Sequence, residues 1–441
     1  MTQNLAAKAA GGLFAKTLET PAVQSVARRL EAGGVVSLNG ICAGAQPFLA
    51  VCLHRAFPRR PLICVTPGLK AQETFHQDVE TWLDQVRGAK DEELVPPTSV
   101  SHVPPRPLFY PEWEILPHEA RLPHVDVISE RLETLVALSA LSVGDSPVLR
   151  GAAEGGPPST LVVTTVTALL QRTFCPGDLR SRTRTLKAGD KLDPLDLTEW
   201  LEEQGYEPEA QVTQKGEFAW RGGILDVFPL TEPWPIRLEF FGDELESLRG
   251  FDPLTQISRE QIARVTLPPG GELGILKGRR QKARAADHAE AGLATLLDYL
   301  PREAIFILCE PGLLVEHADE YARQVPDGDP FLISWEAFQG HLQQRQMTVC
   351  CLAETEPDIA SMESPNPPSA IPNPQFQSLE AHRPLTGRAP ERQVADAQRR
   401  EFHTMRSETR VAPHPGETRV IPAIRTVGAP LSAVESARVV P

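Results

Sequence analysis

The stretch from Gly216 to Asp252 reads GEFAWRGGILDVFPLTEPWPIRLEFFGDELESLRGFD and says more about fold and function than any other part of the chain. Its pattern predicts two short strands that meet across a proline-rich turn, followed by an acidic edge. Successive side chains of a strand point to opposite faces. One face of the second predicted strand therefore carries Ile236, Leu238 and Phe240, and the other carries Arg237, Glu239 and Phe241.

An arginine and a phenylalanine on the same side of a strand have two explanations. Arginine and aromatic side chains are enriched at the centres of protein interfaces, so the pair is typical of a docking surface. Alternatively, the strand is buried on both faces and Arg237 forms an ion pair with Glu239 or Glu217. The spacing of the residues alone leaves both explanations open.

Two motifs in this stretch carry a family resemblance. The first is G-E-F-A-x-R-G-G-I-L-D-x-F-P, beginning at Gly216, and the second is R-L-E-F-F-x-D-E-x-E-S-L-R-x-F-D, beginning at Arg237. Together they resemble the UvrA-interaction domain that occurs in the bacterial excision nuclease subunit UvrB and in the transcription-repair coupling factor family, Mfd. The N-terminal third of Mfd is similar to UvrB. The resemblance includes charged positions that packing alone would not dictate.

Nearer the N-terminus, the pattern predicts a strand at Val35–Asn39, a glycine-containing turn, a helix and a second strand at Pro61–Thr66, which is the layout of a P-loop unit. Laid on the Walker pattern G-x-x-x-x-G-K-[ST], the turn places four residues at the defining positions, namely Gly40, Ala45, Gln46 and Pro47. The lysine that contacts phosphate and the hydroxyl that binds magnesium are both missing. Pro47 also removes a backbone N–H near the start of the helix. We therefore expect a degenerate loop without a nucleotide cofactor.

The degenerate loop favours one branch of the family. UvrB keeps a working P-loop and clamps damaged DNA with a tyrosine-rich hairpin, whereas the UvrB-like part of Mfd has lost the nucleotide site. This chain has four scattered tyrosines, too few for a platform on which bases stack. The Mfd-like module is therefore the preferred interpretation, and a UvrB-like, ATP-dependent subunit that binds damaged DNA is the alternative.

Composition narrows the class of partner. The net charge of −14 falls mainly on residues 1–378, and such an acidic surface repels the phosphate backbone of DNA. Seven cysteines lie mostly in apolar runs without metal-ligand spacing, which predicts reduced thiols and no metal site. No apolar run approaches the length of a membrane span. We expect a cytoplasmic protein that contacts another protein and no membrane.

The order of elements predicts an α/β fold in which a small α/β domain interrupts a larger, P-loop-like domain with a parallel sheet. Residues 20–177 resemble UvrB-like domain 1a with the degenerate loop, 178–270 the UvrA-interaction domain, and 285–356 domain 1b, which would complete the first sheet. A proline-rich linker is expected at 357–378. From 379 to 441 we expect a helical segment and then a disordered tail, as in the product of a truncated or frame-shifted gene.

The resemblance implies a specific role. Mfd proteins recruit UvrA during transcription-coupled nucleotide excision repair, and the family's UvrA-contacting positions fall on Arg221, Arg237 and Phe241. In the family, the polymerase-binding domain and the ATP-driven DNA translocase motor lie further along the chain, and neither is recognisable here. We therefore expect no catalytic residues and only an indirect link to RNA polymerase and DNA. A gene fragment without function is the remaining alternative.

Overall fold

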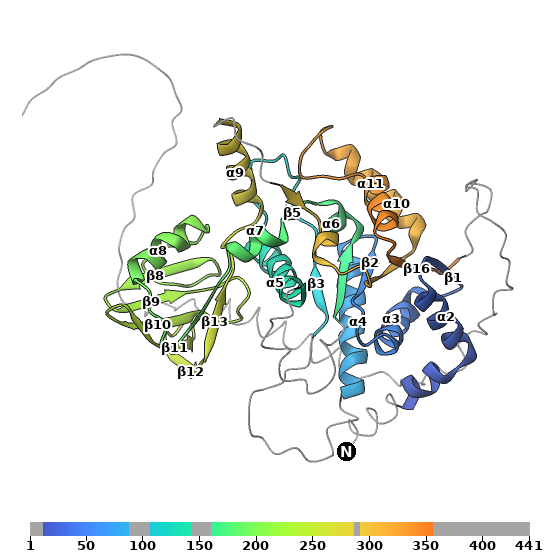
Figure 1. Cartoon of the computed structure of the whole chain (residues 1–441), viewed down its shortest axis with the longest axis horizontal. Coiled ribbons are helices and arrows are strands. Elements are labelled where there is room, and N and C mark those ends of the chain that lie inside the picture. Colours follow the sequence, from blue (N-terminus) through green and yellow to red (C-terminus); the bar gives the residue numbers. More distant parts are fainter. Residues whose placement is uncertain (1–11, 88–105, 143–159, 286–291, 356–441) are drawn as a thin grey trace, which may run out of the picture. The chain divides into compact units, whose positions relative to one another are not determined.

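The computed structural model describes residues 12–87, 106–142, 160–285 and 292–355 (Figure 1). The linker expected at 357–378 and the segment expected at 379–441 lie outside the described residues, and both remain predictions. All seven cysteines belong to the described part, and none of them forms a disulfide. No helix in this part is both long enough and apolar enough to cross a lipid bilayer.

The larger sheet has six parallel strands in the order β1-β16-β15-β2-β4-β3 (Figure 1). These strands are β1 (Val35–Asn39), β2 (Leu62–Thr66), β3 (Leu108–Tyr110), β4 (Leu161–Thr165), β15 (Ile305–Cys309) and β16 (Thr348–Ala353). Strand β1 has the bounds expected from the sequence, and β2 begins one residue later than expected. The residues of β2, β4 and β15 are all buried, as is typical of a parallel sheet covered on both faces.

Alternate residues of the strands supply two hydrophobic cores, one on each face of this sheet. On one face, Leu62 and Cys64 share a core with the helices α2 (Pro21–Ala32), α3 (Gln46–Ala56) and α4 (Leu69–Arg87). On the other face, Ile63 and Val65 share a core with α5 (Val125–Ser142), α6 (Val166–Leu170), α10 (Pro311–Gln324) and α11 (Trp335–Gln344). Both faces are therefore covered by helices, which confirms the α/β class and the parallel sheet.

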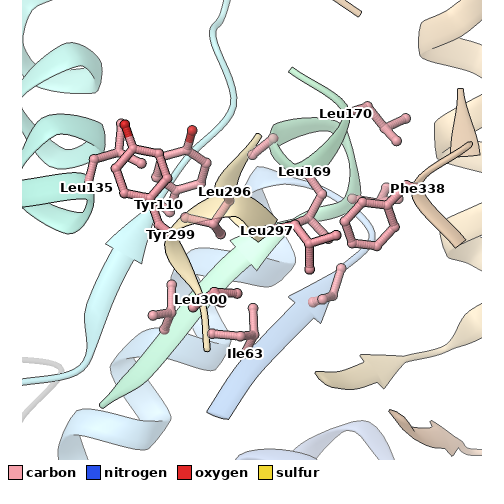
Figure 2. Close-up of a cluster of buried hydrophobic side chains, with 14 of the residues drawn as sticks. Ile63, Tyr110, Leu135, Leu169, Leu170, Leu296, Leu297, Tyr299, Leu300 and Phe338 are labelled. Atoms are coloured by element: carbon pink, nitrogen blue, oxygen red, sulfur yellow. The ribbon is translucent and has the colours of Figure 1, made fainter. Parts of the chain in front are cut away.

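Segments that precede and follow the small domain in sequence build one of these cores together. Figure 2 shows Ile63, Leu135 and Leu169 gathered with Leu296 and Tyr299 of the short 3-10 helix η2 (Leu296–Tyr299). A short antiparallel pair, β5 (Thr173–Phe174) and β14 (Leu293–Ala294), also joins the two segments. Because β15 and β16 lie between β1 and β2, the first segment cannot complete this sheet by itself.

A buried ion pair joins α5 to the start of α9 (Leu273–Ala285). The side chains of Arg131 and Glu272 are both 0% exposed, and Nε of Arg131 lies 2.8 Å from Oε2 of Glu272. The guanidinium group of Arg131 lies 4.3 Å from the centre of the Tyr110 ring and 4.6 Å from that of Trp113. The indole N–H of Trp113 donates to the same carboxylate at 3.0 Å. Both buried charges are thus paired, and the pair holds α5 against the end of the small domain.

The small domain is built on a second six-stranded sheet in the order β12-β11-β10-β9-β8-β7. Its strands are β7 (Glu207–Pro208), β8 (Glu217–Arg221), β9 (Ile224–Val227), β10 (Ile236–Phe241), β11 (Glu244–Phe251) and β12 (Ser258–Gln261). Helix α7 (Pro176–Ser181) precedes this domain, and a separate pair of strands, β6 (Arg184–Lys187) and β13 (Arg264–Leu267), belongs to it. Helix α8 (Pro194–Glu203) covers one face, where Leu197 and Leu201 share a core with Leu225 and Leu238.

The prediction of two strands in Gly216–Asp252 is wrong, because this stretch forms four strands, β8 to β11. Gly222 has a φ of +62°, a conformation that glycine adopts without strain. Gly223 lies so close to β10 that an added Cβ would approach the carbonyl oxygen of Phe240 to 2.9 Å. The two glycines therefore turn the chain between β8 and β9. The expected acidic edge is part of the strand β11, where the exposed residues Glu244 and Glu246 alternate with the buried residues Leu245 and Ser247.

Candidate functional site

The side of the small-domain sheet that faces away from α8 carries the residues expected to bind a partner. Residues paired directly across neighbouring strands share one face of a sheet. One row of such pairs joins Arg221, Ile224, Glu239 and Ser247, and the next row joins Ala219, Asp226, Arg237 and Arg249. We call these eight residues, together with Phe241 at the end of β10, the outer face.

Arg237 is held in place by a cross-strand carboxylate. Its Nε donates to Oδ1 of Asp226 at 2.7 Å, and its Nη2 donates to Oδ2 at 2.8 Å. The guanidinium group also lies 4.7 Å from the centre of the Phe251 ring. The hydrogen bonds to Asp226 raise the pKa of Arg237 above its usual range.

The pairing of Arg237 differs from both explanations drawn from the sequence. Its side chain is 17% exposed, so it is neither an open surface cation nor fully enclosed. Its partner is Asp226, and not Glu239 or Glu217. The carboxylate of Glu217 instead accepts backbone N–H groups of Thr213 and Gln214. The local pattern predicts a single strand where β8 and β9 form a hairpin, so it does not reveal the register that places Asp226 opposite Arg237.

Arg221 and Phe241 lie at the same end of the sheet, each at the end of its own strand. Strands β8 and β10 both run antiparallel to β9, and Arg221 and Phe241 are their last residues. Phe241 is 77% exposed, and Ile224 beside Arg221 is 38% exposed. Arg221 is exposed, and it forms no ion pair with any other residue in the described ranges. Within the described residues, the fold thus presents an unpaired cation at the same end of the sheet as an uncovered aromatic ring.

A second carboxylate–arginine contact lies beside the first. Oε2 of Glu239 is 3.7 Å from Nε of Arg249, and the hydroxyl of Ser247 donates to the same oxygen. Arg249 is exposed and was not singled out from the sequence. Its position opposite Arg237 follows from the register of β10 and β11, which the sequence argument did not recognise as a strand pair.

The loop expected to correspond to a nucleotide site follows β1 as a tight turn that contains an internal hydrogen bond. Gly40 has a φ of +76°, and a short 3-10 helix η1 (Ala43–Ala45) leads directly into α3. Gln46 stands where a Walker loop has lysine, and it is only 3% exposed. Its amide Nε2 donates to the carbonyl oxygen of Ile41 at 3.2 Å, which closes the loop on itself. Pro47, the next residue, occupies the first turn of α3.

The same amide group also binds a carboxylate that lies 264 positions further along the sequence. Nε2 of Gln46 donates to Oε1 of Glu310 at 2.6 Å, and the backbone N–H of Glu354 donates to that oxygen at 3.0 Å. Glu310 adopts a left-handed backbone conformation with a φ of +55°, which is unusual for a residue other than glycine. A carboxylate beside the loop disfavours a phosphate there, because the two anions repel each other. Among the described residues, no group of three His, Cys, Asp or Glu side chains is placed to hold a metal ion.

Comparison with known proteins points to a repair family. The UvrB interaction domain family matches residues 185–272. The transcription-repair-coupling factor of Haemophilus influenzae is 30% identical over 231 residues, which cover 45% of this chain and 19% of that protein. The corresponding protein of Myxococcus xanthus is 29% identical over 293 residues, covering 66% of this chain and 22% of the relative. The transcription-repair-coupling factor of Mycobacterium bovis is 37% identical over 237 residues, which cover 51% of this chain and 18% of that protein.

This chain thus spans about a fifth of the length of the curated relatives that it matches. The matched domain contains strands β8 to β12, so it includes the whole outer face. The chain is therefore similar to part of the transcription-repair-coupling factors, and its residues 185–272 match the UvrB interaction domain family.

Proposed function

We propose that this chain is a binding module that recruits UvrA in transcription-coupled nucleotide excision repair, and that the outer face is its docking surface. The observation that carries the proposal is the side chain of Phe241, which is 77% exposed at the end of β10, whereas the other residues of this strand are buried or half-buried. Fully burying a phenylalanine side chain contributes about 2–3 kcal/mol. A partner with an apolar pocket would gain that contribution here.

Arg237 and Arg221 would contribute differently to binding, because only Arg237 is paired with a carboxylate within the described residues. Arg237 is already paired with Asp226, so it supplies directed N–H donors more than net charge. Arg221 is exposed at the end of the sheet that also carries Phe241, and it brings charge without a carboxylate partner within the described residues. The matching surface of UvrA would therefore present a carboxylate opposite Arg221, carbonyl acceptors opposite Arg237 and an apolar pocket for Phe241.

The nucleotide loop belongs to the same proposal as a degenerate, structural element. The hydrogen bonds of Gln46 to Ile41 and Glu310 occupy the place where a lysine would reach phosphate, which supports a module that neither binds nor hydrolyses ATP. These contacts count against the UvrB-like, ATP-dependent alternative. A link to RNA polymerase and DNA would come through regions that the relatives carry outside the matched part, and a cytoplasmic location follows from the proposed role.

Binding of purified UvrA to the whole chain, measured by titration, tests the docking surface. We expect Phe241→Ala and Arg221→Ala each to weaken binding by roughly tenfold or more, because removal of an interface anchor commonly costs about 2 kcal/mol or more. Leu254→Ala is the matched control, since Leu254 is 91% exposed in the turn between β11 and β12, at the opposite end of the sheet. Equal affinity in all four proteins would remove the docking surface from this face.

A further inference from the structure

We propose that Asp226 is a positioning residue for partner binding, which acts by holding the guanidinium group of Arg237 in the orientation that the partner recognises. This inference rests on the proposed docking function and adds a residue that never touches the partner. Asp226 is 3% exposed, so its carboxylate is covered by the small domain itself. Its influence on a partner must therefore pass through Arg237.

Three features of the structure hold Arg237 in place, namely its strand pairing, its hydrogen bonds and the ring of Phe251. Asp226 on β9 is directly paired with Arg237 on β10, so their backbones are held in register. Two parallel hydrogen bonds of 2.7 and 2.8 Å match the fork of the guanidinium group to the two carboxylate oxygens. The ring of Phe251 supports the flat face of the guanidinium group at 4.7 Å. A guanidinium group has five N–H donors, and these contacts use two of them.

The remaining three donors are thereby held in one fixed orientation. An arginine side chain has many rotamers in solution, and a partner that binds a mobile arginine loses affinity through the ordering of that side chain. Here the ordering is complete before the partner arrives, because Asp226 and Phe251 already select one rotamer. Arg221 has no such support within the described residues, so preorganisation distinguishes the two arginines of the docking surface.

A purely structural ion pair would be coupled to folding and not to recognition. Removal of Asp226 would then weaken the fold, and any loss of binding would be independent of the side chain at position 237. A positioning role predicts the opposite pattern, in which the effect of Asp226 on binding disappears once Arg237 is gone. The two roles are therefore separable by a double-mutant cycle.

The cycle measures UvrA affinity for the whole chain carrying Asp226→Asn, Arg237→Ala or both. We expect Asp226→Asn to weaken binding about fivefold to tenfold, Arg237→Ala to weaken it further, and the double variant to bind as weakly as Arg237→Ala. Arg237→Lys keeps a cation beside Asp226 but loses the two parallel hydrogen bonds to its carboxylate. We therefore expect Arg237→Lys to weaken UvrA binding about as much as Asp226→Asn, and this variant serves as a second test if Asp226→Asn folds poorly. Asp193→Asn is the charge-matched control, because Asp193 caps α8 and asparagine caps helices equally well.

A second readout needs no partner. In nuclear magnetic resonance spectra of the free chain, the Nε–H group of Arg237 should be rigid and slow to exchange, and Asp226→Asn should make it mobile. A mobile Nε–H group in the wild-type chain would overturn the inference. So would an additive cycle, or an Asp226→Asn variant that binds as tightly as the wild type while Arg237→Ala does not. If Arg237→Ala, Arg221→Ala and Phe241→Ala all bind normally, the docking surface itself is wrong and the inference falls with it.

Discussion

The amide of Gln46 donates a hydrogen bond to the carboxylate of Glu310 across 2.6 Å, although the two residues are 264 positions apart in the sequence. One residue follows β1 and the other follows β15, so the bond joins the segments on either side of the small domain at the ends of two strands of the sheet. The bond also places a carboxylate beside the loop that follows β1. We therefore expect the bond to contribute to stability and to disfavour phosphate binding at this loop.

Replacement of Gln46 tests the contribution to stability. We expect Gln46→Ala to lower the free energy of unfolding by about 1–3 kcal/mol, because it leaves the buried carbonyl of Ile41 and the half-buried carboxylate of Glu310 without that donor. Urea denaturation measures the change. Gln77→Ala, at an exposed position of α4, should leave the denaturation midpoint nearly unchanged. Equal midpoints for Gln46→Ala and the wild type would show that the bond is not a stabilising one.

Addition of nucleotide tests the ligand side of the same loop. A ligand present at 100 times its dissociation constant stabilises a protein by about 2.7 kcal/mol, which is readily detected as a rise in melting temperature. We expect millimolar Mg-ATP to leave the melting temperature of this chain unchanged, because Gln46 and Glu310 leave no site for the phosphates. A saturable rise in melting temperature that Gln46→Ala abolishes would contradict this expectation and revive the ATP-dependent alternative.

The buried pair Arg131–Glu272 offers a test of how charge is tolerated in the core. Removing one partner leaves the other charge buried alone, so Arg131→Met should destabilise the fold by about 3–5 kcal/mol. The double variant Arg131→Met/Glu272→Leu leaves no unpaired charge and should be more stable than Arg131→Met. Thermal and urea unfolding provide both values. A double variant less stable than the single one would mean that the pair contributes through packing between Tyr110 and Trp113 and not through charge.

The pH dependence of stability should include a contribution from Glu130 on α5. Burial, followed by repulsion from Asp126 and Glu133, raises the pKa of Glu130 from 4.5 to about 7. The folded state therefore holds a proton that the unfolded state releases, and the free energy of unfolding falls as the pH rises from about 4.5 to about 7. The contribution is at most about 3 kcal/mol, and contact with solvent reduces it.

Substitution of the carboxyl group removes this dependence. Glu130→Gln should be more stable than the wild type at pH 8 and equally stable at pH 4, where Glu130 is neutral in both states. Unfolding in urea at the two pH values measures the difference. A stability gap of the same size at both pH values would assign the effect to packing of the new amide and not to titration of Glu130.

The turn between β8 and β9 depends on the absence of a side chain at Gly223. An alanine Cβ there would lie 2.9 Å from the carbonyl oxygen of Phe240, which is backbone and cannot rotate away. Gly223→Ala should therefore destabilise the small domain by about 1–3 kcal/mol. Gly278→Ala in α9 meets nothing within 4 Å and should instead stabilise the helix by about 0.5–1 kcal/mol. Melting temperatures that shift in the same direction for both variants would contradict this account.

The sequence by itself determined the α/β class, the bounds of β1 and the resemblance of the small domain to the UvrB interaction domain family. These features depend on local patterns, because alternation, glycine turns and motif residues lie within a few positions of one another. The expectation of a degenerate loop is of the same kind, because it rests on Gln46 standing at the lysine position of the Walker pattern. Likewise, the exposure of Phe241 could be expected from its place opposite Ile236 and Phe240 in the alternation of a single strand.

Only the tertiary structure decided which side chains meet. Asp226 and Arg237 pair because β9 and β10 align in one register, and Gln46 reaches Glu310 because β15 and β16 are inserted between β1 and β2. Neither pairing leaves a mark in the local pattern, since many carboxylates of this acidic chain could have served as partners. The register of a sheet is set by the whole set of buried contacts on its covered face, and the partners on the other face follow from that choice.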